Sequence, residues 1–182
     1  MSKIRLLTLA LAALLLVPSL AFAGDAPGTI EWKANNKIYD AHGKFQKWHF
    51  TRITVPDGDL EKGTVEMEID IASVWEKADA LAEHLRQADF FNVAEYATAT
   101  VKIDRVKKTG EKSYEGVATV TMHGHTNEVP ITFDVVGMDP IAIEGKATVN
   151  RTDFGIGGPY DASNDRSIVE DVQVMISAKL ER

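Results

Sequence analysis

Residues 64–71 read Thr-Val-Glu-Met-Glu-Ile-Asp-Ile and decide the fold class, because apolar and acidic side chains alternate through most of the stretch. Successive side chains of a β-strand point to opposite faces of a sheet, so a period of two sorts these residues into two sets. One set faces a core and the other faces water, as expected of a half-buried strand. The apolar set is Val65, Met67, Ile69 and Ile71.

The same period returns at the other end of the chain, where Val172, Val174, Ile176, Ala178 and Leu180 alternate with Gln173, Met175, Ser177 and Lys179. Clusters of Gly, Pro, Asp and His mark turns between the strand-like segments. Together these signals predict about eight antiparallel strands. The remaining strand-like segments are 28–34, 43–55, 98–107, 113–122, 128–136 and 141–150.

Eight such strands in a flat sheet would leave two exposed edges that invite aggregation, and closure into a barrel removes both edges. An eight-stranded barrel is just wide enough to hold its own side chains or one small ligand. We therefore predict an all-β, eight-stranded antiparallel barrel. Its alternation does not distinguish an open interior from a filled core.

One segment departs from the strand pattern. Ala78, Leu81, Ala82 and Leu85 recur at helical spacing, which predicts a short amphipathic helix over residues 77–86. An aromatic cluster follows the helix. The insert either caps one end of the barrel or crosses over the outside of the sheet, and periodicity favours neither arrangement.

The first 23 residues have the three-part layout of a secretory signal peptide: Lys3 and Arg5, an apolar run over residues 6–17, and Ala21-Phe22-Ala23. The apolar run is shorter than the roughly 20 residues that cross a bilayer. We predict cleavage after Ala23, with an uncleaved anchor as the alternative. Residues 24–182 then form one domain. No later segment approaches spanning length, so we expect no stable membrane insertion.

Composition narrows the chemistry. The chain has no cysteine, which excludes disulfides, Cys-ligated zinc and a thiol nucleophile. Loss of Lys3 and Arg5 with the signal peptide takes the formal net charge from −7 to −9. An acidic chain without a basic cluster repels nucleic acid and anionic lipid headgroups. No nucleotide-binding, zinc-protease or serine-hydrolase motif is present, and we expect no cofactor.

Four segments in order resemble the YceI-like family. Residues 84–96 (HLRQADFFNVAEY) and residues 150–156 (NRTDFGI) are similar to the two segments that mark it. Residues 120–126 (VTMHGHT) and residues 39–45 (YDAHGKF) resemble two further family segments. Order and spacing agree over nearly the whole chain after the signal peptide.

The resemblance implies a lipocalin-like barrel and a periplasmic or secreted protein that binds a polyisoprenoid or another long-chain amphiphile. Transport or storage of that lipid would be its role, without catalysis. Two alternatives stay open: an exported structural or stress-related barrel without ligand, and an enzyme that acts on a quinone or isoprenoid lipid. A homodimer is also left open.

An apolar lipid tail needs only a dry, apolar wall, and aromatic side chains are the first candidates for it. They form the wall or cap of a cavity, or they fill a closed core. The candidates are Phe45, Trp48, Phe90, Phe91, Tyr96, Phe133 and Phe154.

Charged residues near these segments are candidates for contact with a lipid headgroup. Arg151 and Asp153 share one face if their stretch is extended, and a guanidinium binds anions well. Tying the strand end to a neighbouring turn is the alternative, and we favour it. His84 and Arg86 have the same two interpretations. They could contact a headgroup, or they could have a structural role, because basic residues often interact with the free carbonyls of the last helical turn.

His123 and His125 could offer two imidazoles to a metal ion, but no third ligand lies near them in the sequence. A turn at Gly124 is the simpler interpretation. We therefore predict no metal site.

Overall fold

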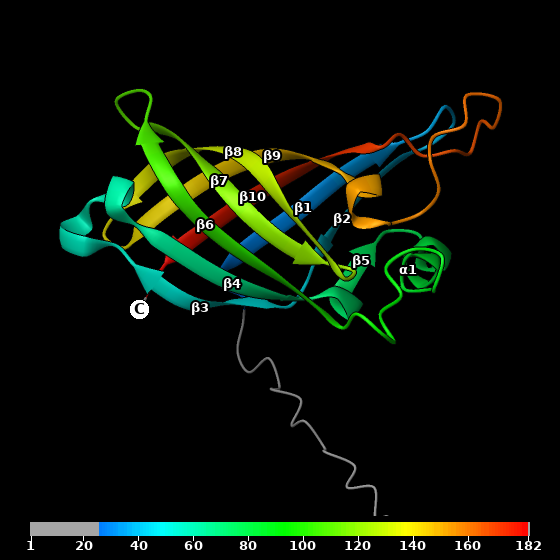
Figure 1. Ribbon diagram of the computed structural model, residues 1–182, viewed down its shortest axis with the longest axis horizontal. Coiled ribbons are helices and arrows are strands. Elements are labelled where there is room, and N and C mark those ends of the chain that lie inside the picture. Colours follow the sequence, from blue (N-terminus) through cyan, green and yellow to red (C-terminus); the bar gives the residue numbers. More distant parts are fainter. Residues whose placement is uncertain (1–25, 182) are drawn as a thin grey trace, which may run out of the picture.

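The computed structural model describes residues 26–181, so the predicted signal peptide and its cleavage after Ala23 lie outside the described residues. Strands dominate the described part (Figure 1). In chain order the elements are β1 (Gly28–Asn35), β2 (Asp40–Phe45), β3 (Trp48–Thr54), η1 (Pro56–Gly58), η2 (Leu60–Lys62), β4 (Thr64–Asp70), η3 (Ile71–Ser73), β5 (Val74–Glu76), α1 (Asp79–Leu85), β6 (Thr98–Lys108), β7 (Ser113–Met122), β8 (His125–Met138), β9 (Ile141–Asn150), η4 (Arg151–Phe154) and β10 (Asp171–Leu180).

All ten strands belong to one antiparallel sheet in the order β3-β4-β6-β7-β8-β9-β10-β1-β2-β5. The two ends of this order meet, because β2 runs into β3 after two residues and β4 runs into β5 through η3. β3 pairs with β4, and β2 pairs with β5. Counting each interrupted pair as one bent strand gives eight sides, and the circuit of pairing closes. The prediction of an all-β, lipocalin-like antiparallel barrel is confirmed, with ten strand segments in place of eight strands.

Backbone hydrogen bonds carry the pairing around the corner where the two bent strands break. The amide of Gln46 donates to Ser73 O at 3.1 Å, and the amide of Asp70 donates to Lys47 O at 3.0 Å. The Ser73 hydroxyl accepts from the amide of Lys47 at 3.0 Å. The sequence predicts one unbroken strand over 43–55, and the corner divides it because a barrel wall must bend.

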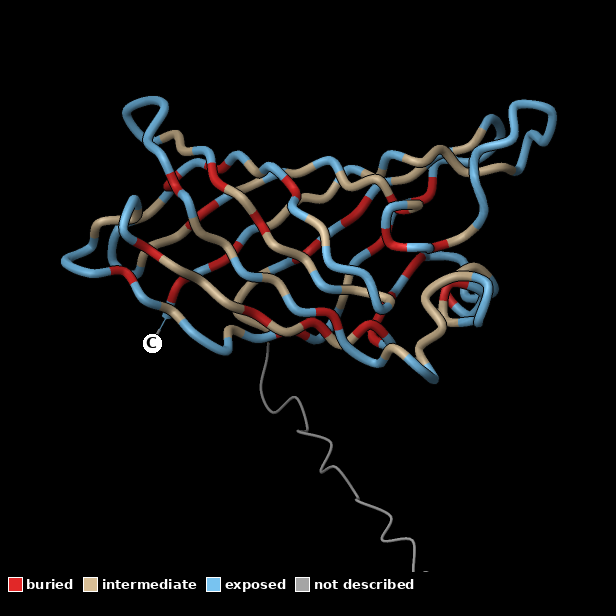
Figure 2. The backbone as a smooth tube through the Cα atoms, in the orientation of Figure 1, coloured by how far each residue is buried: buried red, intermediate tan, exposed pale blue. Residues whose placement is uncertain are grey.

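Alternation places the core inside the barrel, as residues 64–71 predict. Met67 and Ile69 on β4 are buried, and the acidic residues that alternate with them, Glu66, Glu68 and Asp70, are more exposed. Buried positions recur in this way along most strands (Figure 2). The main cluster also includes Ile30 of β1, Phe133 of β8 and Ala178 of β10, so it draws on both termini of the domain.

The β7–β8 connection shows how local chemistry fixes the register. His123 and Gly124 have φ values of 52° and 77°, and Met122 pairs directly with His125. A two-residue loop with both residues in the left-handed region matches the twist of the strands it joins. The turn predicted at Gly124 is confirmed.

The barrel has two unlike ends (Figure 1). At one end lie η1, η2 and the C-terminus. At the other lie α1, η4, the tip of the β1–β2 hairpin and the long loop between η4 and β10. The helix predicted over 77–86 is present as α1. Among residues 26–181 no helix is long and apolar enough to cross a membrane.

Candidate functional site

The barrel interior contains two apolar chambers. The first, here called the far chamber, has a volume of about 150 Å³ and lies toward η1 and η2, where Val55 and Leu60 line it. The second, here called the helical chamber, has a volume of about 180 Å³ and lies toward α1, where Leu81 and Leu85 line it. Native cores have few voids larger than a water molecule, so these are unusually open interiors.

Six residues line both chambers and form a belt between them. Each belongs to a different strand, so the belt runs around the barrel wall at mid-height. All six side chains are branched aliphatic groups, which have no polar atoms. The belt therefore lies between the two chambers, and its apolar side chains form part of the wall of each. Its members are Ile30, Ile69, Val101, Val120, Val149 and Val174.

The helical insert caps the barrel. Leu81 and Leu85 of α1 line the helical chamber, and Phe90 and Phe91 after the helix line it too. Leu85 is 6% exposed and packs in one cluster with Trp32 of β1 and Val74 of β5. Of the two arrangements open from the sequence, the structure shows the cap.

A groove of about 600 Å³, here called the mouth groove, opens beside the helical chamber. The two share six residues, so the groove leads from solvent to the apolar interior. The groove is bordered by the hairpin tip (residues 36–39) and by residues 155–170, here called the strap. The shared residues are Ala34, Ala41, Leu81, Phe90, Arg151 and Ile168.

Arg151 stands between the groove and the chamber and holds both ends of the strap. It is 6% exposed and donates hydrogen bonds to four backbone carbonyls. At the start of the strap it reaches the oxygens of Ile156 and Gly158, both at 2.7 Å. At the end of the strap it reaches those of Ile168 at 2.6 Å and Val169 at 3.1 Å. One side chain thus fastens the loop base that borders the mouth.

The close approach of Arg151 explains a glycine in the strap. Gly157 has a φ of 65°, and a Cβ there would lie 3.0 Å from Nη1 of Arg151. Burial lowers the pKa of Arg151, and the charge of Glu170 opposes that shift. Within the described residues Arg151 forms no ion pair at contact distance. The dipoles of the four carbonyl groups stabilise its positive charge instead.

The expectation that Arg151 and Asp153 share a face of an extended strand is wrong. Residues 151–154 form the 3-10 helix η4, because Asn150 caps it by accepting a hydrogen bond from the amide of Thr152 at 3.0 Å. Arg151 points inward, and Asp153 is exposed and lines neither chamber. The structural role that we favour for Arg151 agrees with its four carbonyl contacts.

A second buried charge lies at the same end of the barrel. Glu76 on β5 is fully buried, and one of its carboxylate oxygens accepts a hydrogen bond from the Tyr39 hydroxyl at 2.6 Å. The other oxygen accepts from the amide of Ala78, just before α1. The hydrogen bond between the Tyr39 hydroxyl and Glu76 raises the pKa of Tyr39. Glu76 therefore ties the hairpin tip to the start of the helical cap.

The structure divides the seven predicted aromatic residues. Phe45, Phe90 and Phe91 line the helical chamber, and Phe133 lines the far chamber. The other three line neither chamber. Trp48 packs edge-to-face on Phe50 at the strand corner, Phe154 lies in a separate buried cluster, and Tyr96 packs on His123.

The two basic residues of α1 have different surroundings. Arg86 donates to the carbonyls of Ala72, Val74 and Ala82, so it caps the helix and fastens it to the sheet. His84 lines the mouth groove and lies 2.9 Å from Asp89. That contact lowers the pKa of Asp89.

His123 and His125 lie side by side, with parallel rings 6.5 Å apart. His123 Nδ1 lies 3.0 Å from Phe154 O, which ties the β7–β8 turn to η4. Across residues 26–181 no group of three His, Cys, Asp or Glu is placed to hold a metal ion. The pair contributes to packing at the helical end.

Sequence reasoning missed the strap and the belt as parts of the site. The belt could be predicted from sequence, because its residues occupy inward-facing positions of strands in which apolar and polar side chains alternate. The strap could not be predicted in this way, because its role depends on carbonyl contacts that no side-chain pattern records.

Comparisons with known proteins identify relatives of this chain in sequence and in structure. The family model for the YceI-like domain matches residues 25–180. The chain belongs to the YceI-like family. A UPF0312 protein of Pseudomonas fluorescens is 33% identical over 142 residues, covering 74% of this chain and 73% of the relative. Another, from Pseudomonas savastanoi pv. phaseolicola, is 31% identical over 178 residues, covering 90% and 92%.

Two solved structures share the fold at low sequence identity. BcnA of Burkholderia cenocepacia has a TM-score of 0.73 at 17% identity, over 82% of this chain and 94% of that one. A polyisoprenoid binding domain from Saccharophagus degradans has a TM-score of 0.60 at 15% identity, over 85% and 95%. The resemblance to the YceI-like family seen in the four sequence segments is confirmed.

Proposed function

We propose that this YceI-like protein binds one long-chain lipid, with a polyisoprenoid as the leading candidate, and carries or stores it after export to the periplasm. The observation that carries the proposal is the apolar interior: two chambers that adjoin at an aliphatic belt and lie beside the mouth groove. A related fold in Saccharophagus degradans is a polyisoprenoid binding domain, which supports this class of ligand.

The chemistry of the wall suits an isoprenoid tail, which has no polar groups to satisfy. Arg151 is the one charged residue that lines the helical chamber in the described part of the chain. Burial of apolar groups contributes about 0.8 kcal/mol per methylene, so ten methylenes give roughly 8 kcal/mol before association costs. Those costs subtract at least about 4 kcal/mol, which leaves room for micromolar binding of a longer tail.

The size of the chambers sets a condition on binding. A dry apolar cavity of about 150 Å³ takes up a molecule the size of benzene. Each chamber here has a similar volume, so a longer tail must occupy both and displace the belt side chains between them. We therefore expect binding to widen the belt.

The same geometry favours binding over catalysis. An enzyme acting on a quinone or isoprenoid would need titratable groups that converge on the cavity. The sequence offers His123, His125, Asp153 and Arg151 for such a role. Of these four only Arg151 lines a chamber, and its guanidinium is already engaged by four backbone carbonyls. A ligand-free structural barrel would need a filled core, and the two chambers argue against it.

Native mass spectrometry of protein purified from the periplasm without detergent tests the proposal. We expect a one-to-one apolar adduct that solvent extraction releases and identifies. A protein that has the unliganded mass, and that takes up neither geranylgeraniol nor decylubiquinone when either is added, would contradict it. Recovery from the cytoplasm, with residues 1–23 still attached, would contradict the export part alone.

A further inference from the structure

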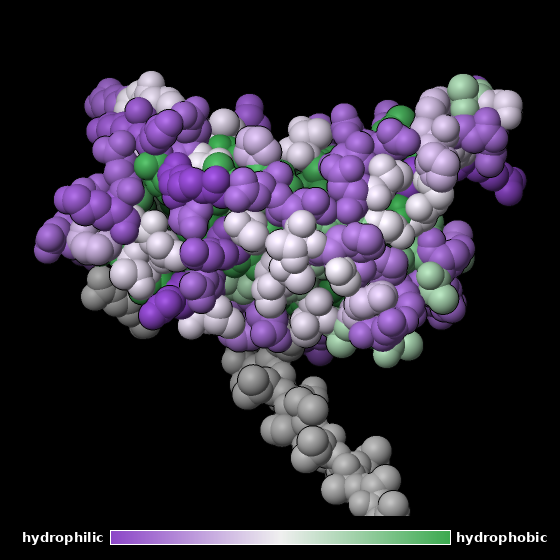
Figure 3. Space-filling model, viewed as in Figure 1, coloured by the Kyte–Doolittle hydropathy of each residue, from purple (hydrophilic) through white to green (hydrophobic). Residues whose placement is uncertain are grey.

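The mouth of the barrel carries exposed apolar side chains on two projecting loops. Ile38 on the hairpin tip is 64% exposed, and Tyr39 beside it is 42% exposed. Tyr160 on the strap is 40% exposed. Both loops extend beyond the barrel at the helical end (Figure 1). In the space-filling view, pale green apolar atoms lie at the tip of the projection among polar ones (Figure 3).

We infer that the hairpin tip and the strap form a lip that docks on the surface of a lipid bilayer, where the tail enters or leaves the barrel. The inference rests on the proposed function, because it concerns the source of the same lipid. An apolar tail crosses water at high cost, so a mouth in contact with the bilayer shortens the wet path. The mouth groove borders this lip, and Ile38 and Tyr39 line it.

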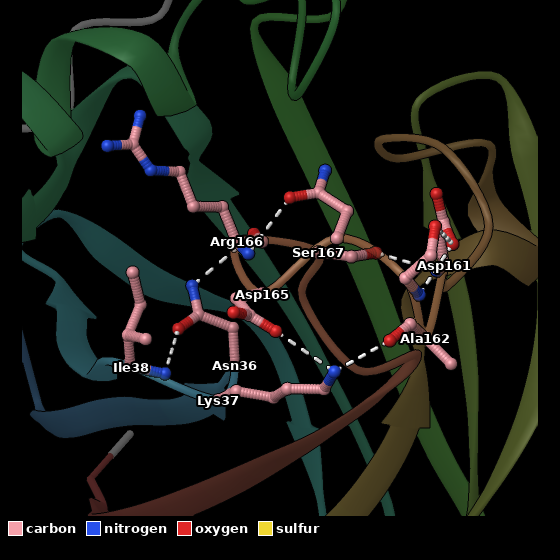
Figure 4. Close-up of polar contacts among 10 residues, drawn as sticks. Asn36, Lys37, Ile38, Asp161, Ala162, Asp165, Arg166 and Ser167 are labelled. Atoms are coloured by element: carbon pink, nitrogen blue, oxygen red, sulfur yellow. Dashed lines mark hydrogen bonds and ion pairs between the residues drawn. The ribbon is translucent and has the colours of Figure 1, made fainter.

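The charges of the lip favour a lipid surface over a charged protein partner. Lys37 is paired within the lip: its ammonium donates to Asp165 at 3.0 Å and to the carbonyl of Ala162 at 2.6 Å (Figure 4). The other charged residues of the lip are Asp161, Arg166 and Glu170, so its charges are of both signs and nearly balance, which gives a charged protein partner little to attract. Tyr160 suits an interface of this kind, because a tyrosine ring is apolar and its hydroxyl can stay in contact with water.

The two loops are held together by exposed contacts. In the Lys37–Asp165 pair the side chains are 47% and 65% exposed. The Asn36 amide donates to Arg166 O at 3.3 Å, also at the surface (Figure 4). Such exposed pairs stabilise little in water, so the tips of the two loops hold each other only weakly there. The base of the strap stays fixed by Arg151.

A transfer experiment with decylubiquinone separates docking from binding. Trp32 lines the helical chamber, and a quinone close to it quenches its fluorescence. Quenching is measured first at equilibrium, with the quinone supplied in detergent micelles, and then as a rate, with the quinone supplied in phosphatidylethanolamine vesicles. The test variant is I38S/Y160S. The matched control is V136S/M138S, because Val136 and Met138 are 55% and 70% exposed and lie on β8, whose end is away from the mouth.

We expect I38S/Y160S to take the quinone from vesicles at least about fivefold more slowly than the wild type, because two apolar side chains no longer enter the bilayer. Its dissociation constant in micelles should change much less than its rate from vesicles, because Ile38 lines the mouth groove and neither chamber, and V136S/M138S should match the wild type in both assays. Equal vesicle rates for I38S/Y160S and the wild type would overturn the docking inference and leave the proposed function intact. So would equal slowing by both variants.

Other outcomes are equally decisive. If the wild type binds no quinone in micelles and no geranylgeraniol by mass spectrometry, the proposed function fails. If I38S/Y160S turns a dimer into a monomer in sedimentation velocity without slowing transfer from vesicles, the lip is an interface between two copies and the docking inference is wrong.

Discussion

The two ends of the barrel are closed by different chemistry. At the far end the described residues pack Val55, Leu60 and Leu180 around the chamber, and no buried charged side chain lies there. At the helical end lie the three buried polar or charged side chains of the described chain. Those three are Ser73, Glu76 and Arg151. One end is held by apolar packing, and the other by hydrogen bonds between loops.

The difference identifies the end that can open. Apolar packing loses free energy in proportion to the area exposed, whatever the direction of the opening. Hydrogen bonds from a few side chains to loop carbonyls break at defined points and reform with water. A barrel that must admit a lipid therefore has its mouth where loops are fastened by Arg151, Glu76 and Lys37.

The largest expected effect comes from removing the fastening of the strap. Arg151→Met keeps an apolar stem but leaves four carbonyls without their donor, and buried acceptors left unpaired are costly. We expect the free energy of unfolding in urea to fall by about 3 kcal/mol. Hydrogen exchange should increase in the strap and in η4 and stay unchanged around Leu180.

Arg151→Lys is the control for charge. A single ammonium cannot reach the carbonyls at both ends of the strap, so it should recover less than half of the lost stability. A loss below about 1 kcal/mol for Arg151→Met would show that the strap is held by other contacts.

The next effect concerns the belt that joins the chambers. Val120→Phe adds a ring at mid-height and should block a tail from passing between them. We expect affinity for geranylgeraniol to fall at least about tenfold, while overpacking costs about 1–3 kcal/mol of stability. Thr121→Phe is the matched control, because Thr121 is the next residue on β7 and is exposed. Equal affinities for the two variants would mean that the tail does not cross the belt.

A smaller effect is expected at the junction of hairpin tip and cap. Tyr39→Phe removes the hydroxyl that donates to the buried Glu76 carboxylate. We expect a loss of about 1–2 kcal/mol, measured by urea unfolding. Glu76→Gln in the Tyr39→Phe background should lose less than the sum of the two single changes, because the pair shares one hydrogen bond. Strict additivity would contradict the coupling of tip and cap.

The smallest effect lies on the surface of the mouth groove. His84 lowers the pKa of Asp89, and the pair is exposed. A carboxyl with a lowered pKa stabilises the fold above its unfolded pKa and loses that contribution as pH falls through the folded pKa. His84→Ala should therefore raise the pKa of Asp89 toward 3.8 in an NMR titration. An unchanged pKa would show that the contact is not formed in solution.

The sequence predicts the barrel well because alternation is a direct record of which side chains face inward. It predicts the wall and the short helix but leaves the position of that helix open, and it singles out Phe90 and Phe91, which line the helical chamber. Its prediction of the cavity wall fails for some aromatic residues, because the residue type alone does not show whether a buried ring faces a cavity. Phe154 and Trp48 are as buried as any wall residue, yet neither lines a chamber.

The fastening of the mouth lies beyond sequence reasoning for a different reason. The partners of Arg151 are backbone carbonyls, and any residue type can supply a carbonyl at those positions. The turn of η4, which points Arg151 inward and leaves Asp153 in water, depends on the Asn150 cap. Such roles are visible only once the path of the strap relative to Arg151 is known.

The most direct test of the account is a crystal structure of the protein loaded with geranylgeraniol. The account predicts one continuous chain of density that runs from the mouth groove through the helical chamber, past the belt and into the far chamber. Val101, Val120 and Val174 should be displaced outward from their unliganded positions. Density confined to the groove or to the outer surface, with the belt side chains unmoved, would contradict it.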